Sequence, residues 1–320
     1  MANRETYEQQ VALLVRILPI LATEKMFALK GGTAINLFVR DFPRLSVDLD
    51  LTYIPVQSRE ESIKGIDTGL NTIINGIKNT IAGAKVNVQR SAEGHVERLH
   101  VQAGVTIKIE VTPVLRGVVY EPKLMTVTDA VEQKYGFAET WVVSQADLYA
   151  GKIIAALDRQ HPRDLYDVKL LLENEGVSDE LRRAFIAYLL SSRRALNAVL
   201  KPQRHDLSQK YEQEFVGMAA KDVPLEALLE IREKLIDIMV ANMPDDHRRF
   251  LLSFKRGEPD WDLLGLPHVA ELPAVKFRVQ NLEGLGVERR EQELQKLKDV
   301  LYPGDARDSN PEDHPASRLE

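Results

Sequence analysis

Two short stretches near the N-terminus carry residue types that can do chemistry together. Gly31 and Gly32 open the segment KGGTAINLF, and Asp48 and Asp50 follow in RLSVDLDL. Residues two positions apart on a strand point to the same face, so the two carboxylates should project side by side. Paired carboxylates can bind Mg²⁺ while the backbone amides at a helix start hold a triphosphate. The pattern predicts nucleotidyl transfer from an NTP at a two-metal magnesium site.

Each part of this pattern also has a plain structural interpretation. A glycine pair between a strand and a helix is often only turn geometry, and acids on a strand can protect an exposed sheet edge. The distance in sequence favours chemistry, because it lets a short helix return the chain into a neighbouring strand. Thr33 follows the glycines, and Ser46 shares the face of the acids, where its hydroxyl could contact a phosphate.

Two later segments offer charged residues to the same site. The alternating strand VTIKIEVTPV places Glu110 on its polar face, where it could complete the metal site or act as a general base. A solvated strand glutamate is the alternative. In GKIIAALDRQHPRDLYDVKLLL, Lys152 offers a mobile cation for a phosphate tail, and Asp167 falls near the start of the second of two helices. The alternative there is an Arg–Asp ion-pair network that braces a helix hairpin.

The composition excludes several classes of protein. The chain has 320 residues, 44% of them apolar, a formal charge of −6 and no cysteine. Disulfides and thiolate metal sites are therefore excluded, and the net charge argues against a protein that coats nucleic acid non-specifically. The first apolar run is interrupted by Arg16 and Pro19, so we expect a soluble, cytoplasmic protein without membrane contact. Any RNA contact must be local, and the candidate residues for it are Arg159, Arg163, Arg193 and Arg194.

Hydrophobic periodicity predicts an α/β fold with a small mixed-sheet lobe at 1–145, a helical lobe at 146–302 and a disordered tail at 303–320. Strands are expected at 27–29, 45–54, 84–90, 95–102 and 105–114, the last two joined by a hairpin turn at Ala103-Gly104. Helices are expected at 5–23, 33–39, 58–82, 145–159, 163–174, 178–191, 224–242, 244–254, 268–284 and 288–301.

With these motifs in place, the sequence resembles the AbiEii/AbiGii family of nucleotidyltransferase toxins, within the DNA polymerase β-like nucleotidyltransferase superfamily. The resemblance is carried by Gly31-Gly32-Thr33, by Asp48-x-Asp50, and by the run from Lys152 through Arg159, Arg163 and Asp164 to Asp167. It continues through 191–207, 211–218 and 250–265, and so covers most of the chain.

The resemblance implies a role for each matching position. Gly31, Gly32 and Thr33 would contact the nucleotide phosphates, Asp48 and Asp50 would bind metal, Lys152 would contact the triphosphate, and Asp167 would be a second essential acid. It further implies a toxin of a toxin–antitoxin or phage-defence system, with a cognate antitoxin encoded next to it and the 3′ end of a tRNA as acceptor. The chain departs from the family where glycine, rather than a Gly-Ser pair, precedes Thr33.

Two other functions are compatible with the same residues. The acceptor could be a protein side chain or a small hydroxylated molecule. The chain could also be a non-catalytic nucleotide- or RNA-binding module, although the presence of both acids together with Lys152 argues against this.

Overall fold

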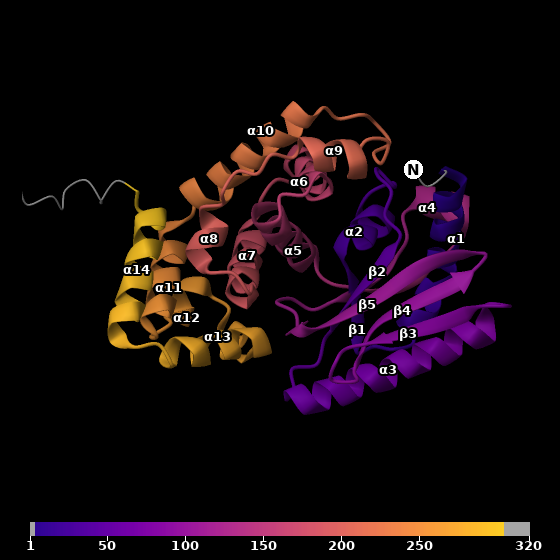
Figure 1. Cartoon of the computed structure of the whole chain (residues 1–320), viewed down its shortest axis with the longest axis horizontal. Helices are drawn as coiled ribbons and strands as arrows, with labels where there is room; N and C mark the ends of the chain where they lie inside the picture. Colours follow the sequence, from indigo (N-terminus) through magenta and orange to yellow (C-terminus); the bar gives the residue numbers. More distant parts are fainter. Residues whose placement is uncertain (1–3, 304–320) are drawn as a thin grey trace, which may run out of the picture.

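The computed structural model describes residues 4–303, apart from the side chains of residues 4, 113 and 114. A mixed seven-stranded sheet with its covering helices is followed by a series of helices, which lie at the left and top of Figure 1. The expected mixed α/β fold is confirmed. The tail expected to be disordered, 303–320, lies outside the described residues except for Pro303.

The sheet has the strand order β3-β4-β5-β2-β1-β7-β6. Strands β2 and β5 pair in parallel, as do β1 and β7, and the other neighbours are antiparallel. Because β2 lies inside the sheet, the alternative that its acids protect a sheet edge is wrong. The strands are β1 (Phe27–Lys30), β2 (Asp48–Tyr53), β3 (Lys85–Arg90), β4 (Val96–Ala103), β5 (Val105–Arg116), β6 (Lys123–Thr126) and β7 (Glu139–Val142).

Helices occupy most of the rest of the described chain. The helices that precede or interrupt the sheet are α1 (Arg4–Ala22), α2 (Gly31–Ala34), which continues as a π-helix (Ile35–Val39), α3 (Arg59–Thr80) and α4 (Asp129–Tyr135). The later ones are α5 (Gln145–Asp158), α6 (Pro162–Asn174), α7 (Asp179–Ser191), α8 (Leu196–Leu200), α9 (Ser208–Glu214), α10 (Leu225–Ile236) with a π-helix (Asp237–Ala241), α11 (Asp245–Arg256), α12 (Trp261–Leu264), a 3₁₀-helix (Pro267–Glu271), α13 (Pro273–Glu283) and α14 (Val287–Leu301).

The alternation of apolar and acidic residues sets the orientation of β2. Leu49 and Leu51 are buried in the core, whereas Asp48 and Asp50 between them are only partly buried on the other face. Helix α3 begins with a capping box between Ser58 and Glu61. With α1 it packs against the sheet, so the core fixes which face of β2 carries the acids.

Several elements differ from the sequence expectation. The predicted helix at 268–284 is divided, because Pro273 starts a new helix after a 3₁₀ turn. Strands β6 and β7 and helix α4 had no prediction, since each has seven residues or fewer and shows little periodicity. The hairpin turn at Ala103-Gly104 is confirmed, with Gly104 at a φ of 79°. Within residues 4–303, no helix has both the length and the apolar content needed to cross a membrane.

The contact between α3 and the sheet supplies a test of this packing. A Cβ atom added at Gly69 would lie 2.6 Å from a ring carbon of Phe27 and 2.9 Å from the sulfur of Met26. We therefore expect Gly69→Ala to reduce the free energy of unfolding by about 1–3 kcal/mol, measured by urea denaturation. Gly284→Ala is the control, because Gly284 has a φ of −73° and a Cβ atom there would make only ordinary contacts, the nearest at 3.6 Å. Equal stability of both variants would contradict the packing.

Candidate active site

A cleft of about 770 Å³ brings together residues from the sheet and from the later helices. Thr33 and Asp167 do not line it; their side chains are buried behind its wall, with exposed fractions of 1% and 0%. The cleft therefore joins segments that lie far apart in the sequence. The candidate residues that line it are Gly31, Gly32, Ser46, Asp48, Asp50, Glu110, Lys152, Arg159, Arg163, Arg193 and Arg194.

The glycine pair allows a helix to start directly beside an acid. Helix α2 begins at Gly31, immediately after β1, and Gly31 has a φ of 79°. A Cβ atom there would lie only 2.5 Å from Oδ2 of Asp50. At Gly32 a Cβ atom would overlap the guanidinium of Arg44 and lie 3.0 Å from Oγ of Ser46. Both positions therefore require glycine, and both line the cleft at the start of α2, where the first amides of a helix have no partner within the helix.

The two aspartates lie in the cleft with cations beside them. In the strand register, Asp50 is opposite Lys30 on β1, and Asp48 is opposite Lys108 on β5. The Nζ atom of Lys108 lies 3.3 Å from Oδ1 of Asp48. Burial raises the pKa of Asp50, Lys30 opposes this shift, and the neighbouring carboxylates add to it. Burial also lowers the pKa of Lys30, against the attraction of Asp50.

Glu110 is the third carboxylate of the cleft. It is opposite Asp50 in the register and forms an ion pair of 2.5 Å with Arg98 on β4. Lys30, Asp50, Glu110 and Arg98 therefore form a row across four strands in which two adjacent acids lie between two cations. The register places Glu110 beside the aspartates, as its proposed role requires, and Arg98 orients it.

The donor chemistry of the site suits magnesium that arrives with a nucleotide. Residues 4–303 contain no cluster of three or more His, Cys, Asp or Glu side chains placed to hold a metal ion. Asp48 and Asp50 nevertheless supply carboxylate oxygens next to the amides at the start of α2. Mg²⁺ is commonly bound by one or two carboxylates, with substrate phosphates and water completing its coordination. The two acids therefore fit Mg²⁺ as part of a metal–NTP complex.

Thr33 supports the aspartates from behind the cleft. Its hydroxyl donates a hydrogen bond of 2.5 Å to the backbone oxygen of Asp48 and lies 3.1 Å from Oγ of Ser46. In this position it ties the first turn of α2 to the beginning of β2. Ser46 lines the cleft, whereas Thr33 does not.

An ion-pair network around the buried carboxylates of Asp164 and Asp167 forms part of the wall of the cleft. Lys152 Nζ lies 2.8 Å from Asp164 Oδ1 and 3.1 Å from Asp167 Oδ2. Asp167 also accepts two hydrogen bonds of 2.6 Å from Arg44, and Asp164 accepts bonds of 2.6 and 3.0 Å from Arg159. Burial disfavours the charge of Asp164, but Lys152 and Arg159 outweigh it and hold its pKa well below the ordinary value.

These contacts agree with the ion-pair network that the sequence left open as an alternative for this segment. The network extends beyond the helix hairpin, because Arg44 comes from the loop before β2. Lys152 is 8% exposed and lines the cleft, so it can belong to the network and still present its ammonium group to a ligand.

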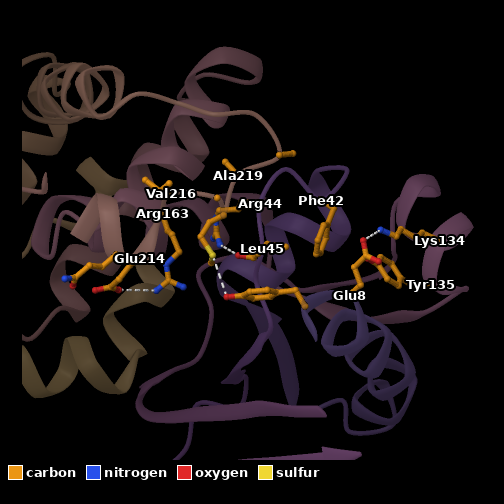
Figure 2. A pocket seen from close by; sticks show the side chains of 15 residues that line it. Glu8, Phe42, Arg44, Leu45, Lys134, Tyr135, Arg163, Glu214, Val216 and Ala219 are labelled. Atoms are coloured by element: carbon orange, nitrogen blue, oxygen red, sulfur yellow. Dashed lines mark hydrogen bonds and ion pairs between the residues drawn. The ribbon is translucent and has the colours of Figure 1, made fainter. Parts of the chain in front are cut away.

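Arg44 is held in place by a loop from the helical part of the chain. Figure 2 shows Arg44 and Leu45 next to Ala219, with Arg163 and Glu214 nearby. Leu45 donates a backbone hydrogen bond of 2.9 Å to Met218, and the backbones of Arg44 and Ala219 form a β-bridge. The loop thereby fixes the segment that leads into Asp48.

The arginines of the cleft differ in how their charges are compensated. Arg194 lies 2.8 Å from Asp158, and Arg163 is 4.0 Å from Glu214. Arg159 pairs with Asp164, whereas Arg193 has no ion pair within the described part of the chain. The rim is therefore rich in cations that an anionic ligand can reach.

Three residues of the site had no role in the sequence prediction. Lys30 precedes the glycine pair directly, and this adjacency was the one available signal. Arg44 precedes the acids in the sequence, but its partner Asp167 is more than a hundred positions away, and no local pattern links them. Lys108 alternates onto the same strand face as Glu110, yet its contact with Asp48 depends on parallel pairing of two strands.

Comparisons with known proteins indicate the family and the fold of the chain. The sequence model of a family described as nucleotidyl transferase AbiEii toxin, type IV toxin–antitoxin system, matches residues 12–275. A search of curated proteins found no match. The fold is similar to that of MenT4, a nucleotidyltransferase toxin from Mycobacterium tuberculosis H37Rv, with a TM-score of 0.56 and 18% identity. That similarity covers 88% of this chain and 95% of the other.

The buried network predicts a pH-dependent contribution to stability. Asp164→Asn removes the charge that faces Lys152 and Arg159, so we expect a loss of about 3 kcal/mol in the free energy of unfolding at pH 7. Because the folded pKa lies below that of the unfolded chain, this contribution is complete above about pH 4 and declines as the pH falls further.

Urea denaturation at two pH values measures this effect. The stability gap between the native chain and Asp164→Asn should narrow by about 1 kcal/mol from pH 5 to pH 3. Asp41→Asn is the control, since Asp41 is exposed and does not line the cleft. A gap that stays constant over this range would be inconsistent with the network.

Proposed function

The chain belongs to the AbiEii family of nucleotidyl transferase toxins of type IV toxin–antitoxin systems, and we propose that its cleft transfers a nucleoside monophosphate from an NTP to the 3′ hydroxyl of a tRNA. A toxin of this type implies an antitoxin partner, which we expect to be encoded beside it. A tRNA acceptor further implies that the protein acts in the cytoplasm. The two lobes of the enzyme would be residues 1–145 and 146–302.

The observation that carries the proposal is the combination of an acidic floor and a basic rim in one cleft. Asp48 and Asp50 on β2, which we call the floor, line the cleft together with Arg193 and Arg194, which follow α7 and which we call the rim. A metal–triphosphate complex needs carboxylates together with phosphate-binding amides. An RNA strand needs cations along its backbone. The cleft offers both within one cavity.

We assign the nucleotide to the floor of the cleft. Asp48 and Asp50 would hold Mg²⁺, which when bound neutralises phosphate charge and lowers the pKa of the attacking hydroxyl. The amides of Gly31 and Gly32 and the hydroxyl of Ser46 would hold the phosphates. These roles are supported by the close approach that the two glycines permit.

The wall of the cleft would support the leaving group and the acceptor. Lys152 would stabilise the charge of the departing pyrophosphate, with Asp167 as a positioning residue that holds its ammonium group. In the reaction, the acceptor oxygen forms a bond to the α-phosphorus, the bond from the α-phosphorus to pyrophosphate breaks, and Glu110 can accept the hydroxyl proton. Arg159 and Arg163 would contact the RNA backbone together with the arginines of the rim.

Removal of either floor carboxylate tests the proposal. We expect Asp48→Asn and Asp50→Asn to lower the rate of nucleotide transfer at least about 100-fold, because each change removes a charge that the metal–NTP complex requires. The assay follows transfer of α-³²P-labelled NTP to total tRNA. Asp41→Asn serves as the matched control and should keep native activity, since Asp41 lies outside the cleft.

The same assay decides between acceptors. Label that appears only on protein would reject the RNA acceptor while leaving nucleotidyl transfer intact. Unchanged transfer by Asp48→Asn would show that these acids do not carry the reaction. Expression in bacteria adds a biological readout, in which growth arrest by the native chain should be lost in Asp48→Ala and Lys152→Ala.

A further inference from the structure

A second and larger groove opens from the candidate active-site cleft. It has a volume of about 1210 Å³ and shares residues 191–194 with the cleft. One wall contains residues 56–59 and the end of β5, and the other contains α13, which Figure 1 shows at the end of the molecule that carries α14. A strand that enters the cleft can therefore continue into this groove without leaving the protein surface.

The groove is strongly basic although the chain as a whole is acidic. Its lining includes Arg59, Arg116 and Arg193. Glu271 is the acidic residue of the lining, and it lies 2.6 Å from Lys276, which largely cancels its charge. Arg59 forms an ion pair with Glu93, whereas Arg116, Arg193 and Arg278 have no ion pair among the described residues and can face a ligand that carries repeated negative charge.

Arg116 is the most informative of these cations. Its Nε atom is buried without a hydrogen-bond partner, and no carboxylate within residues 4–303 forms an ion pair with it. Burial and the neighbouring Arg59 lower the pKa of Arg116, so an anion bound here would relieve both effects. A phosphate group accepts hydrogen bonds from arginine in the planar geometry that guanidinium provides.

An exposed aromatic ring lies in the same groove. Phe277 on α13 is 64% exposed and is one of the lining residues. Unpaired bases stack on such rings, and a basic groove with aromatic platforms is the usual design of a single-strand binding surface. An acidic peptide could form ion pairs with the cations, but it has no bases to stack on the ring. It would also have no reason to continue into the cleft.

We propose that this groove binds the single-stranded end of the acceptor RNA, with Arg116 on a phosphate and Phe277 stacked against a base. The inference rests on the proposed function, because the cleft must receive the 3′ hydroxyl to which the groove delivers the strand. The groove therefore selects acceptors whose unpaired end is long enough to extend from the cleft to Phe277.

Binding of RNA without NTP tests the groove separately from catalysis. The probe is a fluorescent single-stranded RNA of about 12 nucleotides, titrated at several salt concentrations. We expect Arg116→Gln and Phe277→Ala each to weaken binding about tenfold. Arg116→Gln should also reduce the slope of log affinity against log salt by about 0.7, whereas Phe277→Ala should leave the slope unchanged.

Matched controls come from the same chain. Arg249→Gln removes an exposed arginine and Phe137→Ala removes a ring that is 59% exposed, and neither residue lines the groove or the cleft. Both controls should keep native affinity and slope. Circular dichroism and thermal unfolding of all four variants show whether any loss of binding comes from a loss of folding.

A transfer assay then connects the groove to the reaction. The ratio of transfer into the long RNA to transfer into a trinucleotide, which is too short to leave the cleft, should fall about tenfold in Arg116→Gln and Phe277→Ala. A ratio equal to that of the native chain in both variants would overturn the proposal. Polyglutamate serves as a model of an acidic peptide. The proposal would also be overturned if the two variants bound polyglutamate more weakly than the native chain does but bound RNA equally well. If the native chain transfers no nucleotide to any RNA, the proposed function fails, and the binding assay alone decides whether the groove holds RNA.

Discussion

The buried carboxylates of Asp164 and Asp167 impose the constraint on which the rest of the site depends. Neither can stay charged in the interior without cations, and the cations of Asp167 come from two distant segments: Lys152 from α5, and Arg44 from the loop before β2. Formation of this network therefore draws the loop toward the helices. Since that loop leads directly into Asp48, the helical segment helps to determine where the acids of the sheet lie.

On the sheet side of the cleft, the charges of the acids are compensated by lysines on neighbouring strands of the same sheet. Asp50 lies between Lys30 and Glu110 in the register, and Asp48 pairs with Lys108. A metal ion alone would have to displace Lys108 from Asp48, at a cost in Coulomb energy. A metal–NTP complex also brings phosphates that give Lys108 a new partner. The geometry therefore favours binding of metal and nucleotide as one unit over binding of the bare ion.

Local patterns in the sequence were sufficient to place most of the cleft. The alternation in β2 predicted that Asp48 and Asp50 share a face, and the expected helices at 145–159 and 163–174 predicted the helix boundary ahead of Asp167. Long-range pairing was not accessible, because it depends on which strands become neighbours and on ion pairs between distant segments. This is why Lys30 and Arg44 were missed.

The charge distribution explains how an acidic protein could act on RNA with selectivity. The net charge of −6 disfavours general attraction to a polyanion, whereas the cleft and the groove with Arg116 and Phe277 each gather cations at one place. Non-specific binding along a duplex requires an extended basic face, which a narrow groove does not provide. A flexible, unpaired end can enter such a groove, whereas a rigid duplex cannot follow its course. Selectivity for an acceptor end would then arise from shape and local charge, without the need to identify each base along the strand.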